Sequence, residues 1–184
     1  MPKPSIYLIG GSNGAGKTTF AIEFLRKRAT LVRFLNADEI ARGLSPLAPG
    51  QVALKGGRIL LNEIRDSIAR GVDFALESTL SGKTYVRLLQ SARARGYSIE
   101  LHYLRVANVS DAIERIRQRV LQGGHHVPAI DVRRRFGRSL QNLVEHYLPI
   151  ADQWAIWDNT SFPASNIASS GTHTILQVRR MLFS

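Results

Sequence analysis

The sequence predicts an α/β fold in which helices cover both faces of a parallel sheet. Two observations lead to this. Apolar runs typical of strands alternate with amphipathic helical stretches along the chain, and the stretches between runs are long enough for crossover helices. Since 184 residues can build one well-cored domain but hardly two, we expect a single domain over residues 1–184.

About five or six strands are expected, five from clear apolar runs and one from a weaker run. The clear runs are residues 5–9, 31–35, 73–76, 99–105 and 154–157, and the weaker run is 173–178. Helical patterns occupy residues 17–28, 52–70, 83–95, 110–121 and 131–147. Gly71 and Gly96 follow two of these helices and fit their C-terminal ends. Residues 44–50 and 122–128 are expected to be loops.

A glycine-rich turn joins the first strand to the first helix. It matches the pattern G-x-x-x-x-G-K-[ST], which in this strand-to-helix context predicts a P-loop; the alternative is a chance match in an ordinary turn. We therefore expect a P-loop NTPase fold of the nucleotide-kinase type. The residues expected to bind ATP here are Gly11, Ser12, Asn13, Gly14, Ala15, Gly16, Lys17, Thr18 and Thr19.

Each part of the motif has a chemical reason. The glycines allow a tight turn that aims backbone N–H groups at phosphate oxygens, and the helix N-terminus adds its positive dipole end. Lys17 is expected to reach the outer phosphates, and the hydroxyl of Thr18 to ligate Mg²⁺. The motif thus predicts a bound nucleoside triphosphate with Mg²⁺, and the family resemblance described below implies that the nucleotide is ATP.

The chain is strongly basic, with a net charge of +11 and a pI of about 10.8. Residues 115–138 hold seven arginines and only one acidic residue. We interpret this segment as a mobile lid that closes over phosphates, although a solvated helix face is the better explanation for any single arginine taken alone. A nucleic-acid groove would interleave more aromatic residues, and only Phe136 lies in the run, so nucleic acid is the less favoured partner.

Cysteine is absent, which excludes disulfides and thiolate zinc sites. No apolar run reaches the roughly 18 residues of a membrane span, and no secretory h-region is evident. We expect a soluble, cytoplasmic protein with no membrane partner.

Polar residues follow the strands, where ligands of a parallel sheet gather. Asp38 is placed to accept a proton or hold a metal, or else it caps a helix beginning at Glu39. Glu77 ends an apolar run like a degenerate Walker B acid, and Thr79 and Ser81 offer hydroxyls to a substrate. Ser81 is equally suited to cap the helix near residue 83.

Asn159 follows the fifth strand. In that position a loop residue can lie against the adenine base, and a plain turn explains it as well.

Several blocks of the chain resemble the zeta-toxin-like kinases, in particular their shorter bacterial branch. The matching blocks are residues 10–19, 34–41, 74–82, 119–128 and 133–143, so the likeness spans most of the chain. The resemblance implies an ATP-dependent kinase that phosphorylates a hydroxyl of a nucleotide sugar such as UDP-N-acetylglucosamine. It also implies an antitoxin protein as a partner.

Carried over by position, Asp38 resembles the general base, Thr79 a substrate-binding residue and Arg119 a lid arginine that contacts ATP. With Lys17, Asp38 and Arg119 form the expected catalytic set, while Asp38, Glu77, Thr79 and Ser81 form the substrate-binding set. Two positions depart from the family. Ser81 stands where zeta toxins carry a substrate-binding arginine, and Leu61 lies near the place of a substrate-contacting glutamate.

Two other functions remain open from the sequence. One is a kinase acting on polynucleotide ends or on another metabolite, which the basic charge suggests. The other is an ATP-binding regulatory module with little turnover.

Overall fold

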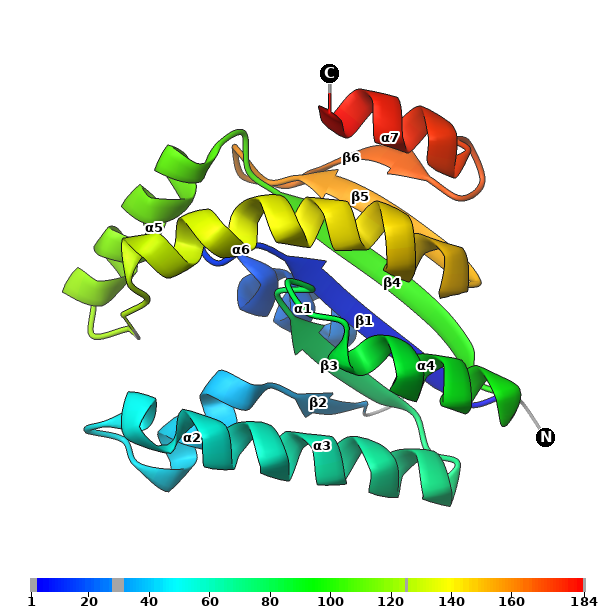
Figure 1. The fold of residues 1–184 in the computed structure, drawn as a ribbon, viewed down its shortest axis with the longest axis horizontal. Coiled ribbons are helices and arrows are strands. Elements are labelled where there is room, and N and C mark those ends of the chain that lie inside the picture. Colours follow the sequence, from blue (N-terminus) through cyan, green and yellow to red (C-terminus); the bar gives the residue numbers. More distant parts are fainter. Residues whose placement is uncertain (1–2, 28–31, 125, 184) are drawn as a thin grey trace.

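The computed structural model describes residues 3–27, 32–124 and 126–183, which build a six-stranded sheet with helices around it (Figure 1). The strand order is β2-β3-β1-β4-β5-β6. The strands are β1 (Ser5–Gly11), β2 (Arg33–Leu35), β3 (Phe74–Ser78), β4 (Ser98–Arg105), β5 (Gln153–Asp158) and β6 (Ser165–Ser169). The first five are parallel and β6 is antiparallel to β5.

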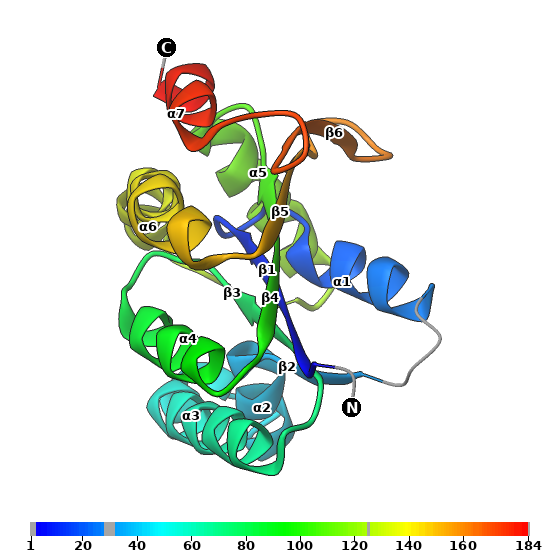
Figure 2. The same ribbon diagram turned by 90° about the vertical axis from the view of Figure 1, so that its right-hand side faces the viewer.

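The helices form two unequal layers. They are α1 (Lys17–Arg26), α2 (Ala37–Leu44), α3 (Ala53–Arg70), α4 (Thr84–Ala94), α5 (Val109–Leu121), α6 (Ala129–Asn142) and α7 (Ile175–Phe183). Short 3₁₀ segments lie at Pro49–Val52 and Leu148–Ile150, and a π-helical turn, Leu143–Tyr147, continues α6. Figure 2 shows the sheet edge-on, with α1 on one face and α3, α4, α6 and α7 on the other.

The strands alternate as a two-faced sheet requires. On β4, Ile99, Leu101 and Tyr103 join the main core beneath α3, α4 and α6. Leu104 points to the opposite face and packs with Ile9 under α1. The sequence forms strands here because both faces of β1 and β4 find apolar cover.

A third apolar cluster joins α5 to α6. It comprises the buried residues Val106, Ala112, Ile116, Val127 and Val132. The arginine-rich segment therefore has a small core of its own, which makes the two helices one packed unit.

The predicted fold class is confirmed, but the sixth strand was placed wrongly. Residues 173–178 lead into α7, because Thr174 and Gln177 form a capping box: the Gln177 side chain accepts from Thr174 N at 2.7 Å, and Gln177 N donates to Thr174 Oγ1 at 3.3 Å. The true sixth strand is polar, and its pairing with β5 rather than its own pattern defines it. The predicted ends at residues 28 and 31 lie outside the described residues.

Helices α2 and α3 pack closely through Gly56. A Cβ at this position would lie 3.1 Å from the Ala37 oxygen and 3.2 Å from the Ala41 Cβ. At the adjacent Gly57 a Cβ would meet no atom within 4 Å. Gly56 thus sets the distance between the helices, whereas Gly57 faces open space.

Replacing Gly56 with leucine is expected to lower the free energy of unfolding by about 1–3 kcal/mol, since the side chain must force α2 from α3. The matched variant Gly57→Leu should be no less stable than the wild type, because a helix-interior glycine itself costs about 0.5–1 kcal/mol. Urea unfolding followed by circular dichroism measures both. Equal losses would show that the close approach at Gly56 does not set the packing.

Candidate active site

The P-loop takes the conformation that its glycines permit. Gly14 and Gly16 have φ angles of 79° and 81°, in the left-handed region. A Cβ on Gly14 would lie 2.4 Å from the Ala112 oxygen, and one on Gly16 would lie 2.5 Å from Asn159 Nδ2. Both positions therefore require glycine, for backbone angle and for space.

Lys17 begins α1 and its side chain is buried inside the loop. Its Nζ donates to the Ser12 oxygen at 3.0 Å and lies 3.9 Å from Glu77 Oε1. Burial lowers the pKa of Lys17 below its usual value, while the negative charges of Glu77 and Asp38 act in the opposite direction. The Lys17 ammonium is therefore held in the site, and the nearby carboxylates offset the cost of its burial only in part.

The carboxylate of Glu77 joins three elements. Its Oε2 accepts from Thr18 Oγ1 at 2.8 Å and from Asn36 Nδ2 at 2.9 Å. Asn36 in turn caps α2, because its Oδ1 accepts from the backbone N–H groups of Asp38 and Glu39 at 2.8 and 3.4 Å. Glu77 thus faces the P-loop, and its expected contact with substrate stays a prediction.

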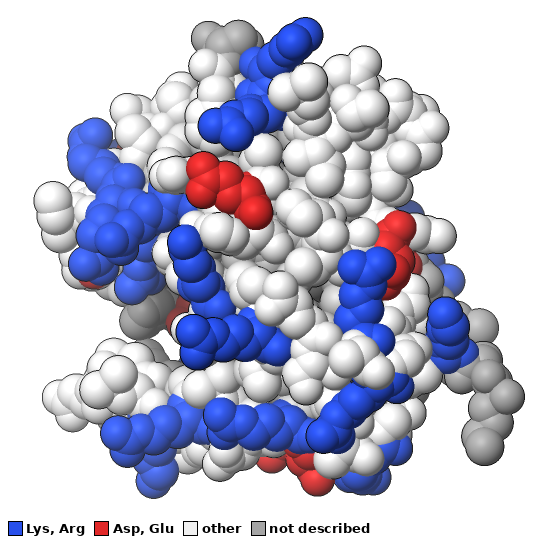
Figure 3. Space-filling view, turned by 45° about the vertical axis from the view of Figure 1, so that its right-hand side comes forward, with Lys and Arg blue, Asp and Glu red and all other residues white. Residues whose placement is uncertain are grey.

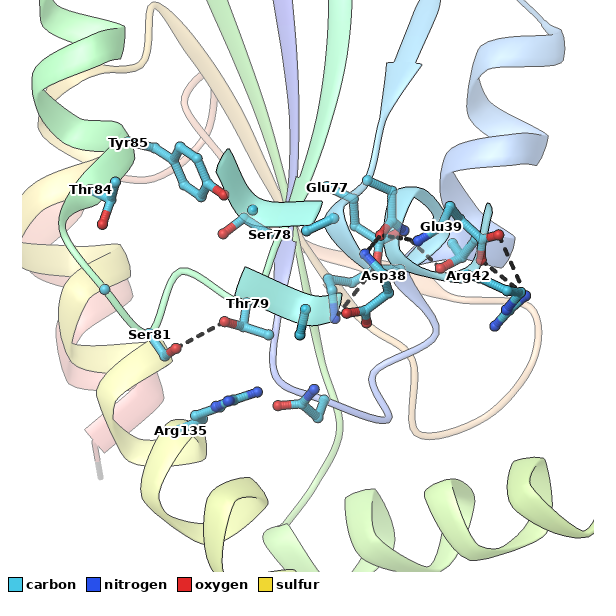
Figure 4. A pocket seen from close by; sticks show the side chains of 18 of the residues that line it. Asp38, Glu39, Arg42, Glu77, Ser78, Thr79, Ser81, Thr84, Tyr85 and Arg135 are labelled. Carbon is cyan, nitrogen blue, oxygen red and sulfur yellow. Dashed lines mark hydrogen bonds and ion pairs between the residues drawn. The ribbon is translucent and has the colours of Figure 1, made fainter. Parts of the chain in front are cut away.

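The alternative role expected for Asp38, capping the helix that follows, is wrong. Helix α2 begins at Ala37 and Asn36 is its cap, so Asp38 lies in the first turn and its carboxylate does not cap the helix. Figure 4 shows Asp38 and Glu77 close together at one side of a cavity. Asp38 lines that cavity and is exposed to it.

Two adjoining cavities meet at the P-loop. The larger has a volume of about 560 Å³ and the smaller about 250 Å³. Both are lined by Gly14, Lys17, Thr18, Glu77 and Arg119. Only the larger one includes Asp38. The two spaces therefore touch where a phosphate held by Lys17 would lie.

Residues of several helices and of the segment that follows β3 line the larger cavity. Helix α3 contributes Leu54, Gly57, Arg58 and Leu61, and α2 contributes Arg42. The lining also includes hydroxyl side chains and one further arginine, which Figure 4 shows across from Arg42: Ser78, Thr79, Ser81, Thr84, Tyr85 and Arg135. Burial, together with the charge of Asp38, raises the pKa of Tyr85, so its phenol stays protonated at neutral pH.

The loop that carries Thr79 and Ser81 is fastened to α6 and its π turn. Ser139 Oγ donates to the Thr79 oxygen at 2.6 Å and Asn142 Nδ2 to the Leu80 oxygen at 2.8 Å. Tyr147 OH donates to the Gly82 oxygen at 2.7 Å. The loop is thus held through its backbone, which leaves its hydroxyls to face the cavity.

Ser81 does not cap α4. That helix has no side-chain cap, and the Ser81 and Thr79 hydroxyls lie 2.9 Å apart as a hydrogen-bonded pair. The alternative role expected for Ser81 is therefore wrong.

Five of the seven arginines of residues 115–138 divide into two groups. Arg115 and Arg119 line the smaller cavity, and Arg119 and Arg135 line the larger. Arg117 and Arg134 instead pair with Glu114 and Asp131 on their own helices and are exposed. Only part of the basic segment therefore reaches the site.

The Gly123–Gly124 pair ends α5 beside Arg119. Gly123 has a φ of 81°, and Gly124 N donates to the Arg119 oxygen at 2.9 Å. A Cβ on Gly124 would lie 2.4 Å from Arg119 Cγ. These glycines close the helix and make room for the arginine stem.

Asn159 lies beside the P-loop. Its Nδ2 donates to the Ala15 oxygen at 2.8 Å, which ties the end of β5 to the loop. The contact with adenine stays a prediction.

Some site residues escaped the sequence reasoning. Asn36 was detectable as a capping residue at a strand end. Arg58 and Tyr85 lie inside helices, and no local pattern sets them apart from solvated or core residues.

Comparison with known proteins identifies relatives of this chain. A family model described as zeta toxin matches residues 1–158. An uncharacterized protein of Haemophilus influenzae is 29% identical over 126 residues, which cover 68% of this chain and 88% of that protein.

Two solved structures share the fold. A structure from the PezAT chromosomal toxin–antitoxin system of Streptococcus pneumoniae has a TM-score of 0.70 at 17% identity, covering 100% of this chain and 79% of that one. A complex of AvrRxo1-ORF1 and -ORF2 with ATP has a TM-score of 0.71 at 16% identity, covering 99% of this chain and 64% of that one. These likenesses support a P-loop kinase type of fold.

Among the described residues no helix is long and apolar enough to cross a membrane.

Replacing Asn36 with alanine is expected to lower the free energy of unfolding by about 1–3 kcal/mol, since both a helix cap and a hydrogen bond to Glu77 are lost. Asn36→Asp should remain destabilised, although aspartate caps helices equally well, because it cannot donate to Glu77 and adds a second negative charge. Denaturant unfolding at pH 7 distinguishes these effects. An aspartate variant as stable as the wild type would show that the hydrogen bond from Asn36 to Glu77 does not stabilise the fold.

Proposed function

The chain belongs to the zeta toxin family, and on that premise we propose that it is an ATP-dependent kinase. The acceptor is a hydroxyl of a nucleotide sugar resembling UDP-N-acetylglucosamine. The observation that supports this best is the meeting of two cavities at Lys17, Thr18, Glu77 and Arg119, with Asp38 only on the larger side. A transferase needs such a division, because donor and acceptor must enter separately and meet at one atom.

In this proposal the triphosphate of ATP lies in the smaller cavity, along the P-loop N–H groups. Lys17 and Arg119 neutralise the charge that spreads over the transferring phosphoryl group. Asn159 lies near the base. Transfer then depends on positioning and charge, since phosphoryl transfer asks little covalent chemistry of the protein.

The acceptor occupies the larger cavity. Asp38 accepts the proton of the attacking hydroxyl, while Thr79 and Ser81 bind other oxygens of the substrate. Arg135 and Arg58 line the same space and suit an acceptor that carries phosphate groups. Arg58 of α3 and Arg135 of α6 thus supply positive charge in place of the arginine that zeta toxins carry at the position of Ser81.

The donor set at the P-loop fits a magnesium ion. Thr18 Oγ1 and Glu77 Oε2 are hard oxygen ligands 2.8 Å apart, of the kind that Mg²⁺ prefers. Thr18 would hold the ion, with Glu77 beside it. When bound, Mg²⁺ neutralises phosphate charge.

The test is the product itself. The protein is incubated with ATP, Mg²⁺ and a metabolite extract, and species that gain one phosphate are identified by mass. A phosphorylated nucleotide sugar supports the proposal. Binding of ATP without transfer to any acceptor would favour a regulatory module instead.

A second candidate acceptor is the end of a nucleic acid. Figure 3 shows Lys and Arg side chains gathered over α3 and over the α5–α6 end of the same face. Exposed basic residues Arg58, Arg87 and Arg138 come from α3, α4 and α6, which all line the larger cavity, and exposed Lys83 directly precedes α4. A steep fall of affinity for an oligonucleotide with rising salt would support this candidate, since each phosphate contact adds to the slope.

An antitoxin is the proposed protein partner, and the likeness to a chain of the PezAT system supports it. A genetic test follows from this. Expression of the chain alone should slow growth if its kinase activity is toxic, and co-expression of a cognate partner should restore it.

Asp38→Asn is expected to reduce phosphoryl transfer by about a hundredfold or more, because the amide cannot accept a proton. ATP affinity should be retained, since Asp38 lies outside the smaller cavity. Single-turnover kinetics and ATP titration measure the two effects. A collapse of ATP affinity would instead assign Asp38 to metal binding or to the fold.

Arg119→Ala is expected to lower the rate of transfer by about a thousandfold, as for other arginines that act on a phosphoryl transition state. Its matched control is Arg117→Ala, because Arg117 pairs with Glu114 and lines neither cavity. Steady-state kinetics of both variants decides. Equal and mild effects would make the basic segment a solvated surface rather than part of the site.

A further inference from the structure

Most of the positive charge of the chain lies on one face of the molecule. Helices α3, α4 and α6 cover the same side of the sheet, and α1 covers the other (Figure 2). Together with Lys83 and Arg95, which flank α4, the three helices contain twelve Lys and Arg residues and three Asp and Glu residues, so they account for +9 of the net charge of +11. Positive charge concentrated on one face is typical of a surface that binds a polyanion.

The exposed basic residues of these helices form short rows, which together we call the basic face. The members of each row are separated by three, four or seven residues, spacings that keep them on one side of a helix. They are Lys55, Arg58 and Arg65 on α3, Lys83 and Arg87 at the start of α4, and Arg134 and Arg138 on α6. Figure 3 shows the band of basic side chains along α3 and further groups above it, with few acidic side chains between them.

Most members of the basic face have no acidic partner. Elsewhere on the surface arginines are paired, as Arg70 is with Asp66 and Arg117 with Glu114. Like charges close together on a helix repel each other and destabilise it. An external anion would relieve this repulsion, because within the described part of the chain no ion pair is formed by Lys55, Arg58, Lys83, Arg87 or Arg138.

The apolar residues around the basic face indicate which kind of anion fits it. The large hydrophobic residues exposed on α3, α4 and α6 are Leu54 and Ile130, and neither is aromatic. A single-stranded nucleic acid stacks its bases on exposed aromatic rings, and an anionic membrane holds a helix by apolar residues that enter it. A nucleic-acid duplex needs only cations, because its bases are paired and its phosphates lie outside. The scarcity of aromatic residues therefore argues against a single strand but not against a duplex.

We propose that the basic face binds the sugar–phosphate backbone of a double-stranded nucleic acid, whatever its base sequence. Lysines and arginines of three helices contact its phosphates, and the release of counterions from the duplex stabilises the complex. This inference goes beyond the proposed kinase function, because the duplex is a partner and not the phosphate acceptor. Arg58, which also lines the larger cavity, lies at the border between the basic face and the site.

The experiment measures binding of a fluorescent duplex by anisotropy over a range of KCl concentrations. The probes are a DNA duplex and an RNA duplex, each closed by a loop at both ends so that neither offers a terminal hydroxyl for phosphorylation. The logarithm of the wild-type association constant should fall linearly and steeply with the logarithm of salt concentration. The double variant Lys55→Gln/Arg87→Gln should make this slope shallower by about two, since each lost phosphate contact removes about one.

The matched control is Arg26→Gln/Lys27→Gln. These two residues are exposed at the end of α1, on the opposite side of the sheet, and their loss changes the net charge by the same amount. The control should keep the wild-type slope. Both double variants should keep the wild-type melting temperature, because the replaced side chains are exposed and form no ion pair among the described residues.

Binding of either closed duplex with the expected slopes supports the proposal, and the duplex that binds more tightly identifies the partner. Three results would overturn it. The wild type could leave both duplexes unbound, or the two double variants could lose the same slope, which would assign binding to the total charge. Tighter binding of a single strand of equal charge, or of vesicles rich in anionic lipid, would assign the basic face to that partner instead.

The measurement is independent of the proposed kinase function. It contains neither ATP nor a nucleotide sugar, so a wrong acceptor would leave its result unchanged. The closed ends also separate backbone binding from phosphorylation of a nucleic-acid end.

Discussion

The carboxylate of Glu77 is the group on which the arrangement of the site depends. One oxygen lies 3.9 Å from the Lys17 ammonium, and the other accepts from Thr18 and Asn36. Through Asn36 the same contact fixes the first turn of α2, where Asp38 lies. A single, largely buried acid therefore links the P-loop to the helix turn that carries Asp38.

Helix α6 organises the opposite side of the larger cavity in a comparable way. The end of this helix and its π turn hold the backbone of residues 79–82, while its N-terminal half brings Arg135 into the same cavity. Because α5 and α6 share an apolar cluster, Arg119 and Arg135 belong to one packed unit. Any movement of that unit would act on both cavities together, which is how a lid would serve a transferase.

The sequence was most informative where local chemistry determines structure. The P-loop glycines, the parallel strands and the helix ends at Gly71 and Gly96 follow from backbone angles and apolar patterns that can be seen in a short window. The polar strand β6 could not be predicted in this way, because pairing with β5 defines it, and an unrecognised capping box at Thr174 turned a predicted strand into α7.

The same limit applies to the site. Asp38, Lys17 and Arg119 were placed by motif and resemblance, and the structure brings all three to the larger cavity. The role of Asn36 depends on which atoms surround its amide, and the presence of Arg58 and Arg135 in one cavity depends on tertiary packing. Residue type and spacing alone predict neither of these features.

The most direct measurement of the central claim is a crystal structure with Mg²⁺ and a non-hydrolysable ATP analogue. The γ-phosphate is expected at the junction of the two cavities, between Lys17 and Arg119, with Asp38 across from it in the larger cavity. A triphosphate whose terminal group points away from Asp38, or a nucleotide that fills the larger cavity itself, would contradict the assignment of donor and acceptor sides.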